Sequence, residues 1–320
     1  IEIVRSASAE FSTQAVAGTI NIILKKSIPL AQYTAKIGYV QRGRQASGLF
    51  TSFQVADKVG TVSYSLPLNI YVGHPRNSGN ESETRNLNAE GVTTQLRRTA
   101  SADNNHNRSI SSAPRAIWTL ENEDVLNLNS FISINASDNR SRTNTISEFG
   151  EYYPFVIEEY NTQNSSENLS NSVQWVHKLG DSAKLELRFG THYWHAQSEG
   201  RTFGRAVDEN PLFARHVRTE NYNRGWSSSG KYSAPYIDDH VLSFGWEAAS
   251  RWQSSDNLTR GTTAINLIVQ PIDQREDVAF KVQRVAVFAQ DEWTLNKQLS
   301  FYLGARWEGI KLHGQGSGLS

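Results

Sequence analysis

The chain has 320 residues, with 32 basic and 32 acidic side chains and a formal net charge of zero. This balance argues against nucleic-acid binding as the main task, because nucleic-acid-binding proteins usually carry a basic excess. The absence of cysteine excludes a disulfide framework and thiolate chemistry. Methionine is also absent and residue 1 lies inside a motif, so we expect the chain to be an internal piece of a longer protein.

Residues 1–26 contain two β-branched strand patterns, at 1–4 and 19–24, joined by a polar segment of small residues. Taken alone, such a pattern also suits a hairpin edge of an α/β domain. The segment resembles the closing part of the plug domain of TonB-dependent outer-membrane receptors. The residues that carry this resemblance are Ile1, Glu2, Arg5, Ser8, Ala9, Ala15, Gly18, Ile20, Asn21, Ile22 and Lys25.

Beyond residue 28 the apolar residues recur at every second position. No window approaches the roughly 18 apolar residues that a transmembrane helix requires. One side of each pattern is apolar and the other is polar or charged, as expected of transmembrane β-strands. The clearest alternating runs are 33–39, 64–72, 126–134, 185–193 and 242–248.

We count eleven such strands, and the links between them alternate in length. Tight polar turns are expected at 56–60, 121–124, 180–182, 235–240 and 295–298. The other links are expected at 41–47 and, as much longer loops, at 73–112, 137–168, 196–221 and 253–279. Short periplasmic turns and long extracellular loops are typical of outer-membrane barrels, which predicts that the first strand rises from the periplasm.

The last strand pair, 285–295 and 299–308, is similar to a hairpin that recurs midway round the barrels of the same receptors. Those barrels have about 22 strands, so the resemblance implies about half a barrel. The predicted fold is all-β, an antiparallel transmembrane β-barrel of about eleven strands belonging to a larger barrel. Residues 1–28 would be the C-terminal end of the plug domain, and residues 29–320 the N-terminal half of the barrel.

Five tryptophans fall within or near the ends of predicted strands. They suit an aromatic girdle at the bilayer interfaces, where amphipathic rings are stable. Cross-strand packing, as in any sheet, is the alternative. The five are Trp118, Trp175, Trp246, Trp293 and Trp307.

No catalytic or metal-binding constellation is evident in the sequence. His192 and His195 are three residues apart, so on a strand they point to opposite faces. The acidic residues before His240 belong to a tight turn, and no strand-turn-helix pattern surrounds the glycines at 314–318. We therefore expect no enzyme activity, no cofactor and no metal.

The expected long loops carry arginine and aromatic side chains that suit an anionic, catecholate- or carboxylate-bearing iron chelate. The alternative is a solvated surface that faces lipopolysaccharide. The candidate ligand-facing residues are Arg97, Arg98, Tyr152, Tyr153, Arg201 and Arg205.

The resemblance also implies a latch in which a plug arginine pairs with inward barrel carboxylates. The matching positions are Arg5 in the plug segment and Glu247 and Glu292 in the barrel. Alternation places both carboxylates on the face opposite the apolar residues of their strands. Solvated charges in a water-filled lumen are the alternative.

These patterns predict a receptor in the outer membrane of a Gram-negative bacterium. The resemblance implies a ferric siderophore as its leading cargo and the TonB energy-coupling protein as its partner, through a segment that this chain lacks. Outer-membrane lipid and lipopolysaccharide would surround it, and no nucleic acid is expected. The alternatives are glycan or cobalamin uptake by the same class of receptor, an outer-membrane barrel enzyme, or a soluble β-rich binding module.

Overall fold

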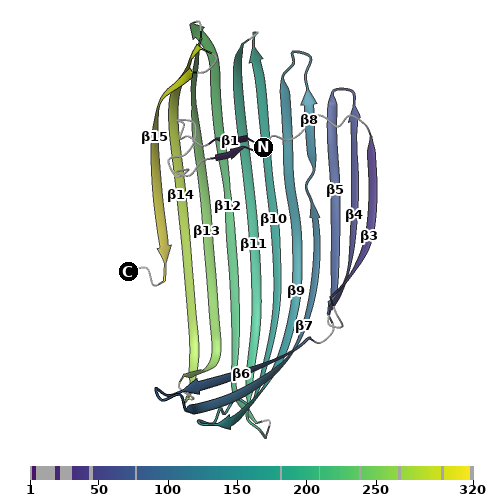
Figure 1. The fold of residues 1–320 in the computed structure, drawn as a ribbon, viewed down its shortest axis with the longest axis vertical. Coiled ribbons are helices and arrows are strands. Elements are labelled where there is room, and N and C mark those ends of the chain that lie inside the picture. The colour runs from purple at the N-terminus through teal and green to yellow at the C-terminus, as the bar shows by residue number, and fades with distance from the viewer. Residues whose placement is uncertain are drawn as a thin grey trace.

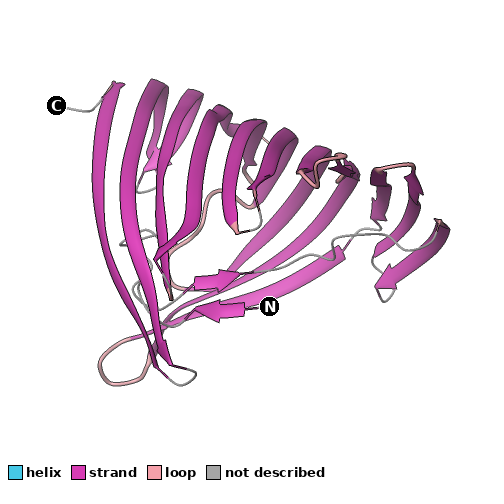
Figure 2. Cartoon of the chain, turned by 90° about the horizontal axis from the view of Figure 1, so that it is seen from above, coloured by secondary structure: helices cyan, strands magenta, loops and turns pink. Residues whose placement is uncertain are grey.

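The computed structural model describes residues 2–4, 19–21, 31–42, 46–75, 78–180, 182–208, 210–237, 239–265, 268–296 and 299–317. All regular structure in these residues is β-strand. The short strands β1 (Glu2–Val4) and β2 (Thr19–Asn21) pair with each other antiparallel, with Glu2 opposite Asn21, and form a separate sheet. Figure 2 shows this hairpin beside one face of a large curved sheet.

The large sheet contains thirteen antiparallel strands. Their bounds are β3 (Gln32–Arg42), β4 (Ala46–Val59), β5 (Val62–Pro75), β6 (Ser78–Leu87), β7 (Thr93–Ser112), β8 (Arg115–Thr119), β9 (Val125–Phe149), β10 (Ile157–Leu179), β11 (Ala183–Arg205), β12 (Pro211–Ile237), β13 (His240–Ile265), β14 (Ile268–Asn296) and β15 (Leu299–Gly316).

Eleven of these strands form one continuous path in chain order, from β3 at one edge to β15 at the other (Figure 1). β8 continues the place of β7, because both pair with β5 and β9. The interruption between them contains Pro114, which cannot donate a backbone hydrogen bond to the ladder. Among the described residues β6 pairs with β7 alone. The predicted all-β antiparallel fold is therefore confirmed, and the predicted eleven strands correspond to the continuous path, with β6 and β8 as two further strands beside it.

At each of the five predicted tight turns the two flanking strands pair with each other or with a common neighbour at the same end of the sheet, and residues 181, 238 and 297–298 of these turns lie outside the described residues. Gly60 and Gly180 adopt positive φ there, at 60° and 71°. Glu123 and Asp239 do the same without being glycine, at 62° and 65°. Such residues let the chain reverse within two to four residues, and we call this end the short-turn edge.

The expected long loops are mostly strand, which corrects the prediction. β9 continues to Phe149 and β10 begins at Ile157, so the connection between them is short. β11 likewise continues to Arg205, and β12 begins at Pro211. The predicted strand boundaries were placed where the alternating apolar residues end. Backbone pairing continues beyond that point, because it does not depend on apolar side chains.

The strands are longer than a bilayer requires. β10 has 23 residues and β14 has 29, whereas about 9–11 residues of a tilted strand span the membrane. One register row runs from Leu126, one residue into β9, to Trp307, eight residues into β15. The distance of this row from the short-turn edge thus grows from one residue to eight residues over six steps from strand to strand. This change corresponds to a strand tilt of about 40°.

Register places the predicted apolar runs on one continuous face of the sheet, because directly paired residues share a face. The row through Leu126 also contains Trp175, Leu187, Trp246 and Val287. We call this the outer face and the opposite one the inner face. Among the described residues no helix or second sheet covers the outer face.

Exposure differs between the two faces. On the outer face Leu303 is 79% exposed and Trp307 is 61% exposed. On the inner face Phe288 is 7% exposed and Ala286 is fully buried. Side chains crowd together on the concave side of a curved sheet, so we place the inner face on the concave side of the sheet in Figure 2.

Candidate functional site

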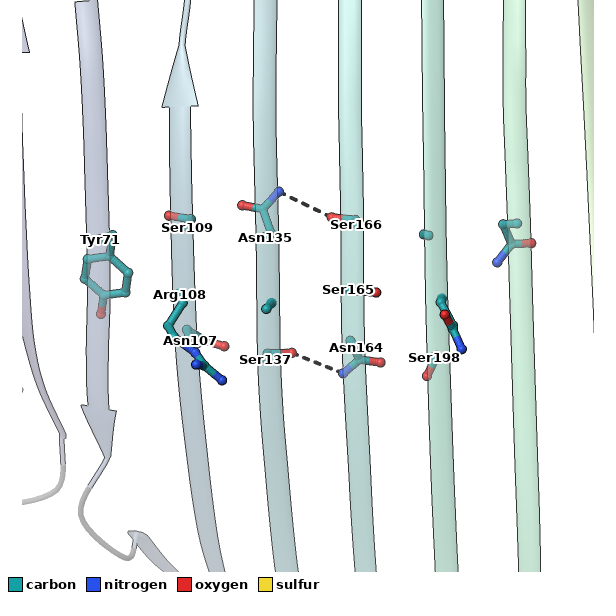
Figure 3. A pocket seen from close by; sticks show the side chains of 14 residues that line it. Tyr71, Asn107, Arg108, Ser109, Asn135, Ser137, Asn164, Ser165, Ser166 and Ser198 are labelled. Atoms are coloured by element: carbon teal, nitrogen blue, oxygen red, sulfur yellow. Dashed lines mark hydrogen bonds between the residues drawn. The ribbon is translucent and has the colours of Figure 1, made fainter.

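Two adjacent register rows on the inner face line a hollow of about 470 Å³ (Figure 3). They come from β5, β7, β9, β10, β11 and β12, so the site depends on strands far apart in the sequence. One row contains Tyr71, Ser109, Asn135, Ser166, Ala196 and Asn221. The other contains Gly73, Asn107, Ser137, Asn164, Ser198 and Thr219.

Two cross-strand hydrogen bonds orient the asparagines of the hollow. The Asn135 amide donates to Ser166 Oγ at 3.3 Å, and the Asn164 amide donates to Ser137 Oγ at 3.2 Å. An asparagine side chain offers two donors and two acceptor lone pairs, so each amide keeps hydrogen-bonding capacity toward the lumen. Trp194 lies on the inner face of β11, one inner-face position from Ala196.

The inner-face residues that line the hollow are uncharged, and Arg108, whose position belongs to the outer face of β7, is the charged residue that borders it. The first row stays uncharged through its partners on β13, β14 and β15, namely Ser255, Val278 and Gly316. On the outer face at the same height, charged pairs such as Arg108 and Asp138, 3.0 Å apart, occur instead. The sequence reading missed these rows. Serine or asparagine at every second position of 133–141 and 164–172 was the signal that could have revealed them.

Closer to the short-turn edge, the inner face carries a charged cluster around Glu247. Glu247 Oε2 accepts from Arg306 at 2.7 Å and from Arg284 at 3.1 Å. Arg306 also contacts Glu308 Oε1 at 2.5 Å and is only 4% exposed. The barrel wall therefore supplies two guanidinium partners for Glu247.

The structure does not bring the two predicted latch carboxylates together. Glu247 pairs in register with Ala286, and Glu292 lies six residues further along β14, about 20 Å away. Both are on the inner face, as alternation predicts, and Glu292 accepts a hydrogen bond from Tyr302 at 3.0 Å. One arginine side chain cannot span that separation. Arg5 lies outside the described residues, so its pairing stays a prediction.

An aromatic cluster covers the inner face at the end far from the short-turn edge. The guanidinium of Arg97 lies 4.2 Å from the ring centroid of Tyr153, and Tyr153 packs edge-on against buried Phe155 at 5.5 Å. The Tyr153 hydroxyl donates to Glu158 at 3.2 Å. Burial and the neighbouring Glu158 carboxylate raise the pKa of Tyr153. Arg97 and Tyr153 are thus the predicted ligand residues that the structure places on the inner face.

The other predicted ligand residues are placed differently. Arg201 and Arg205 belong to β11 and share the outer face with Tyr193. They lie 3.1 Å from Glu199 and 3.4 Å from Glu159, respectively. Arg98 is on the outer face of β7 and bridges Glu83 and Glu148, and Tyr152 is 57% exposed in the β9–β10 connection. The expectation that these arginines are loop residues is therefore wrong.

The five predicted girdle tryptophans all lie on the outer face. Trp118, Trp175 and Trp293 are within four residues of the ends of their strands at the short-turn edge. Trp246 and Trp307 are six and eight residues from that edge. The set covers roughly 20 Å of depth, and the girdle stays a prediction.

The described residues contain no helix long and apolar enough to cross a membrane. They also contain no group of three His, Cys, Asp or Glu side chains placed to hold a metal ion.

The long antiparallel strands, with one apolar and one polar face, have the architecture of a transmembrane β-barrel wall. The family described as TonB dependent receptor-like, beta-barrel matches residues 37–320, and the chain belongs to this family. No curated protein sequence matches the chain. Two solved structures are distantly similar. The toluene transporter TodX of Pseudomonas putida has 7% identity and a TM-score of 0.22, over 88% of this chain and 86% of that one. OccAB3 of Acinetobacter baumannii has 8% identity and a TM-score of 0.13, over 84% and 92%.

Proposed function

We propose that the protein is an outer-membrane receptor of a Gram-negative bacterium that binds a scarce nutrient and imports it with energy from TonB. The observation that carries the proposal is the continuous division between an apolar outer face and a polar inner face in a member of this family. An apolar outer face suits lipid, and a hydrogen-bonding inner face suits a water-filled pore.

A ferric siderophore is the leading cargo, as expected from the family resemblance. The hollow favours an uncharged ligand rich in hydroxyl and carbonyl groups, because its inner-face lining offers amide and hydroxyl groups, and the one cation that borders it, Arg108, is paired with Asp138. A ferric trishydroxamate, which has no net charge, fits this chemistry better than an anionic ferric catecholate. An uncharged glycan fits it equally well, and Trp194 provides a flat surface against which a sugar ring can stack.

The plug latch is also a proposal. Glu292 is the better barrel partner for Arg5, because Glu247 already contacts Arg284 and Arg306 within the wall. A buried arginine and carboxylate cost about 3–5 kcal/mol to separate by removing one partner. Such a contact would keep the plug in place until TonB pulls on it.

The test uses the full-length receptor in cells with and without TonB. The neutral probes are a ferric trishydroxamate and maltooligosaccharides. The anionic probes are a ferric triscatecholate and oligogalacturonates. Asn164→Leu removes an amide from the hollow, and we expect about tenfold weaker uptake of the preferred neutral probe. Gln163→Leu makes the same change on the outer face of the same strand and serves as the matched control.

TonB-dependent uptake of a neutral probe, reduced by Asn164→Leu alone, would support both the transport function and the site. Uptake that is independent of TonB would contradict active transport. TonB-dependent uptake of the anionic probes alone would keep the transport function and overturn the neutral-ligand assignment.

A further inference from the structure

Strand β6 lies at an edge of the large sheet. It pairs with residues 93–103 of β7, on the side of β7 where β5 pairs with residues 107–111. Among the described residues no strand pairs with the other side of β6. Figure 1 shows β6 running across the long axis of the sheet, at the end opposite the short-turn edge. The short turns of outer-membrane barrels face the periplasm, so β6 is expected at the cell exterior.

Side-chain hydroxyls of β7 show which backbone groups of β6 point away from β7. Thr99 Oγ1 donates to the Ser82 carbonyl at 3.4 Å, and Ser101 Oγ donates to the Asn80 carbonyl at 3.4 Å. The even-numbered residues therefore direct their backbone groups toward β7. Successive residues of a strand direct these groups to opposite sides. The residues whose N–H and C=O groups point the other way, which we call the β6 edge, are Gly79, Glu81, Glu83 and Arg85.

The sequence of β6 leaves this edge accessible to another strand. Exposed edge strands are commonly protected by proline, lysine or a bulge, and Ser78–Leu87 contains neither proline nor lysine. The register shift between β6 and β7 lies next to the turn, at Asn86. Residues 79–87 are all exposed. Four consecutive outward-facing residues of β6 are therefore open to pairing.

The β6 edge also carries one charge that its neighbours do not balance. Glu83 lies 2.9 Å from Arg85 and 3.2 Å from Arg98, so its carboxylate is neutralised within the hairpin. Glu81 is exposed and has no ion-pair partner among the described residues. Opposite charges that face each other across two strands are stabilising. A strand added at the edge would therefore gain from a lysine or arginine opposite Glu81.

We infer that the β6 edge accepts an extended segment of a partner protein at the cell surface as a further antiparallel strand, with a basic residue opposite Glu81. In this mode of recognition main-chain hydrogen bonds supply the affinity. The side chains on the opposite face of β6, among them Asn80 and Ser82, are small and uncharged and select little. Backbone contacts alone hold a free peptide weakly, whereas a partner anchored in the same membrane presents its segment at a high effective concentration. The inference concerns the outer rim and does not depend on which nutrient the receptor carries.

The experiment measures peptide binding by the purified full-length receptor in nanodiscs, without TonB and without nutrient. The probe is an end-blocked nonapeptide of alternating threonine and serine with a central lysine, linked to a nanodisc lipid through a flexible spacer. Methylation of every second backbone nitrogen of the probe should weaken binding at least about tenfold, because it removes the donors for the added ladder. Without the lipid the probe should bind at least about tenfold more weakly. Failure to bind would overturn this inference and leave the transport proposal standing.

Three variants separate backbone pairing from charge. Glu81→Pro removes one outward N–H and should weaken binding about tenfold. Glu81→Gln keeps the N–H and should weaken binding only about threefold, as expected of an exposed ion pair. Glu90→Gln removes an exposed carboxylate from the β6–β7 turn, away from the edge, and should leave binding unchanged.

The wild-type receptor provides a test even where Glu81→Pro fails to assemble, because the methylated probe needs no variant. Equal binding of the methylated and unmethylated probes would overturn the inference, and so would an effect of Glu90→Gln as large as that of Glu81→Gln. Self-association of the receptor that competes with the probe would show that a second copy occupies the edge, which would overturn the assignment to a partner protein.

Discussion

Arg306 shows how a single charged residue is accommodated on the inner face. Its guanidinium contacts Glu247 from β13 and Glu308 from its own strand, and only 4% of its side chain is exposed. Nearby Arg284 shares Glu247 but is 34% exposed. The two arginines share Glu247 but differ in burial and in the second contact that Arg306 makes with Glu308, so we compare them.

We expect Arg306→Leu to destabilise the full-length receptor by about 3 kcal/mol, because it leaves a largely buried Glu308 without this cationic partner. Arg284→Leu should cost less, because water can solvate the exposed side of that pair. The measurement is the temperature at which the folded form loses its fast electrophoretic mobility. Equal shifts for the two variants would contradict a larger contribution from the buried Arg306 with its two carboxylate partners.

At the scale of elements, the strands continue well beyond the membrane as paired hairpins. The β9–β10 connection begins at Gly150, whose φ is 87°. A Cβ atom at this position would lie 2.4 Å from the backbone oxygen of Thr94. Gly60, at the β4–β5 turn, has a similar φ of 60° but nothing within 4 Å. The two glycines therefore share a positive φ, which glycine adopts without strain, and differ in the space around them.

Gly150→Ala should displace the β9–β10 connection and loosen the Arg97–Tyr153 contact, because both the φ and the backbone clash oppose a side chain. Gly60→Ala should cost only about 1–2 kcal/mol through its φ. Limited proteolysis of the receptor on intact cells, with mapping of cuts at 150–156, measures the effect. Unchanged cleavage in Gly150→Ala would argue against the close approach to Thr94.

At the scale of the whole molecule, register joins local alternation into two faces with different surroundings. Val173 and Ser172 are neighbours on β10 and lie on opposite faces. Val173 pairs with Leu128 and Phe189 on the outer face, and Ser172 pairs with Asn129 and Gly190 on the inner face. The same substitution at these two positions tests which face meets lipid.

Val173→Arg should cost about 2–4 kcal/mol and reduce assembly into the outer membrane, because it places a charge in hydrocarbon. Ser172→Arg should be tolerated, because its face is solvated. The readout is the amount of heat-modifiable receptor recovered from outer membranes. If both variants assemble equally well, the assignment of the outer face to lipid is wrong.

Alternation along the sequence was sufficient to predict the fold class, the eleven strands and the tight turns. It also predicted the face of Glu247 and Glu292, because parity along a strand is a local property. The same parity, counted from Tyr193, already places Arg201 and Arg205 on the outer face. Their assignment to a ligand loop failed because strand ends were judged by hydrophobicity.

The sequence by itself therefore determined which side of each strand is apolar, and hence the class of protein. Only the tertiary structure decided depth and neighbourhood: the hollow between Tyr71 and Asn221, the 20 Å between Glu247 and Glu292, and the edge position of β6. The physical reason is that alternation fixes a face within one strand, whereas the pairing of whole tilted strands fixes which residues of different strands meet.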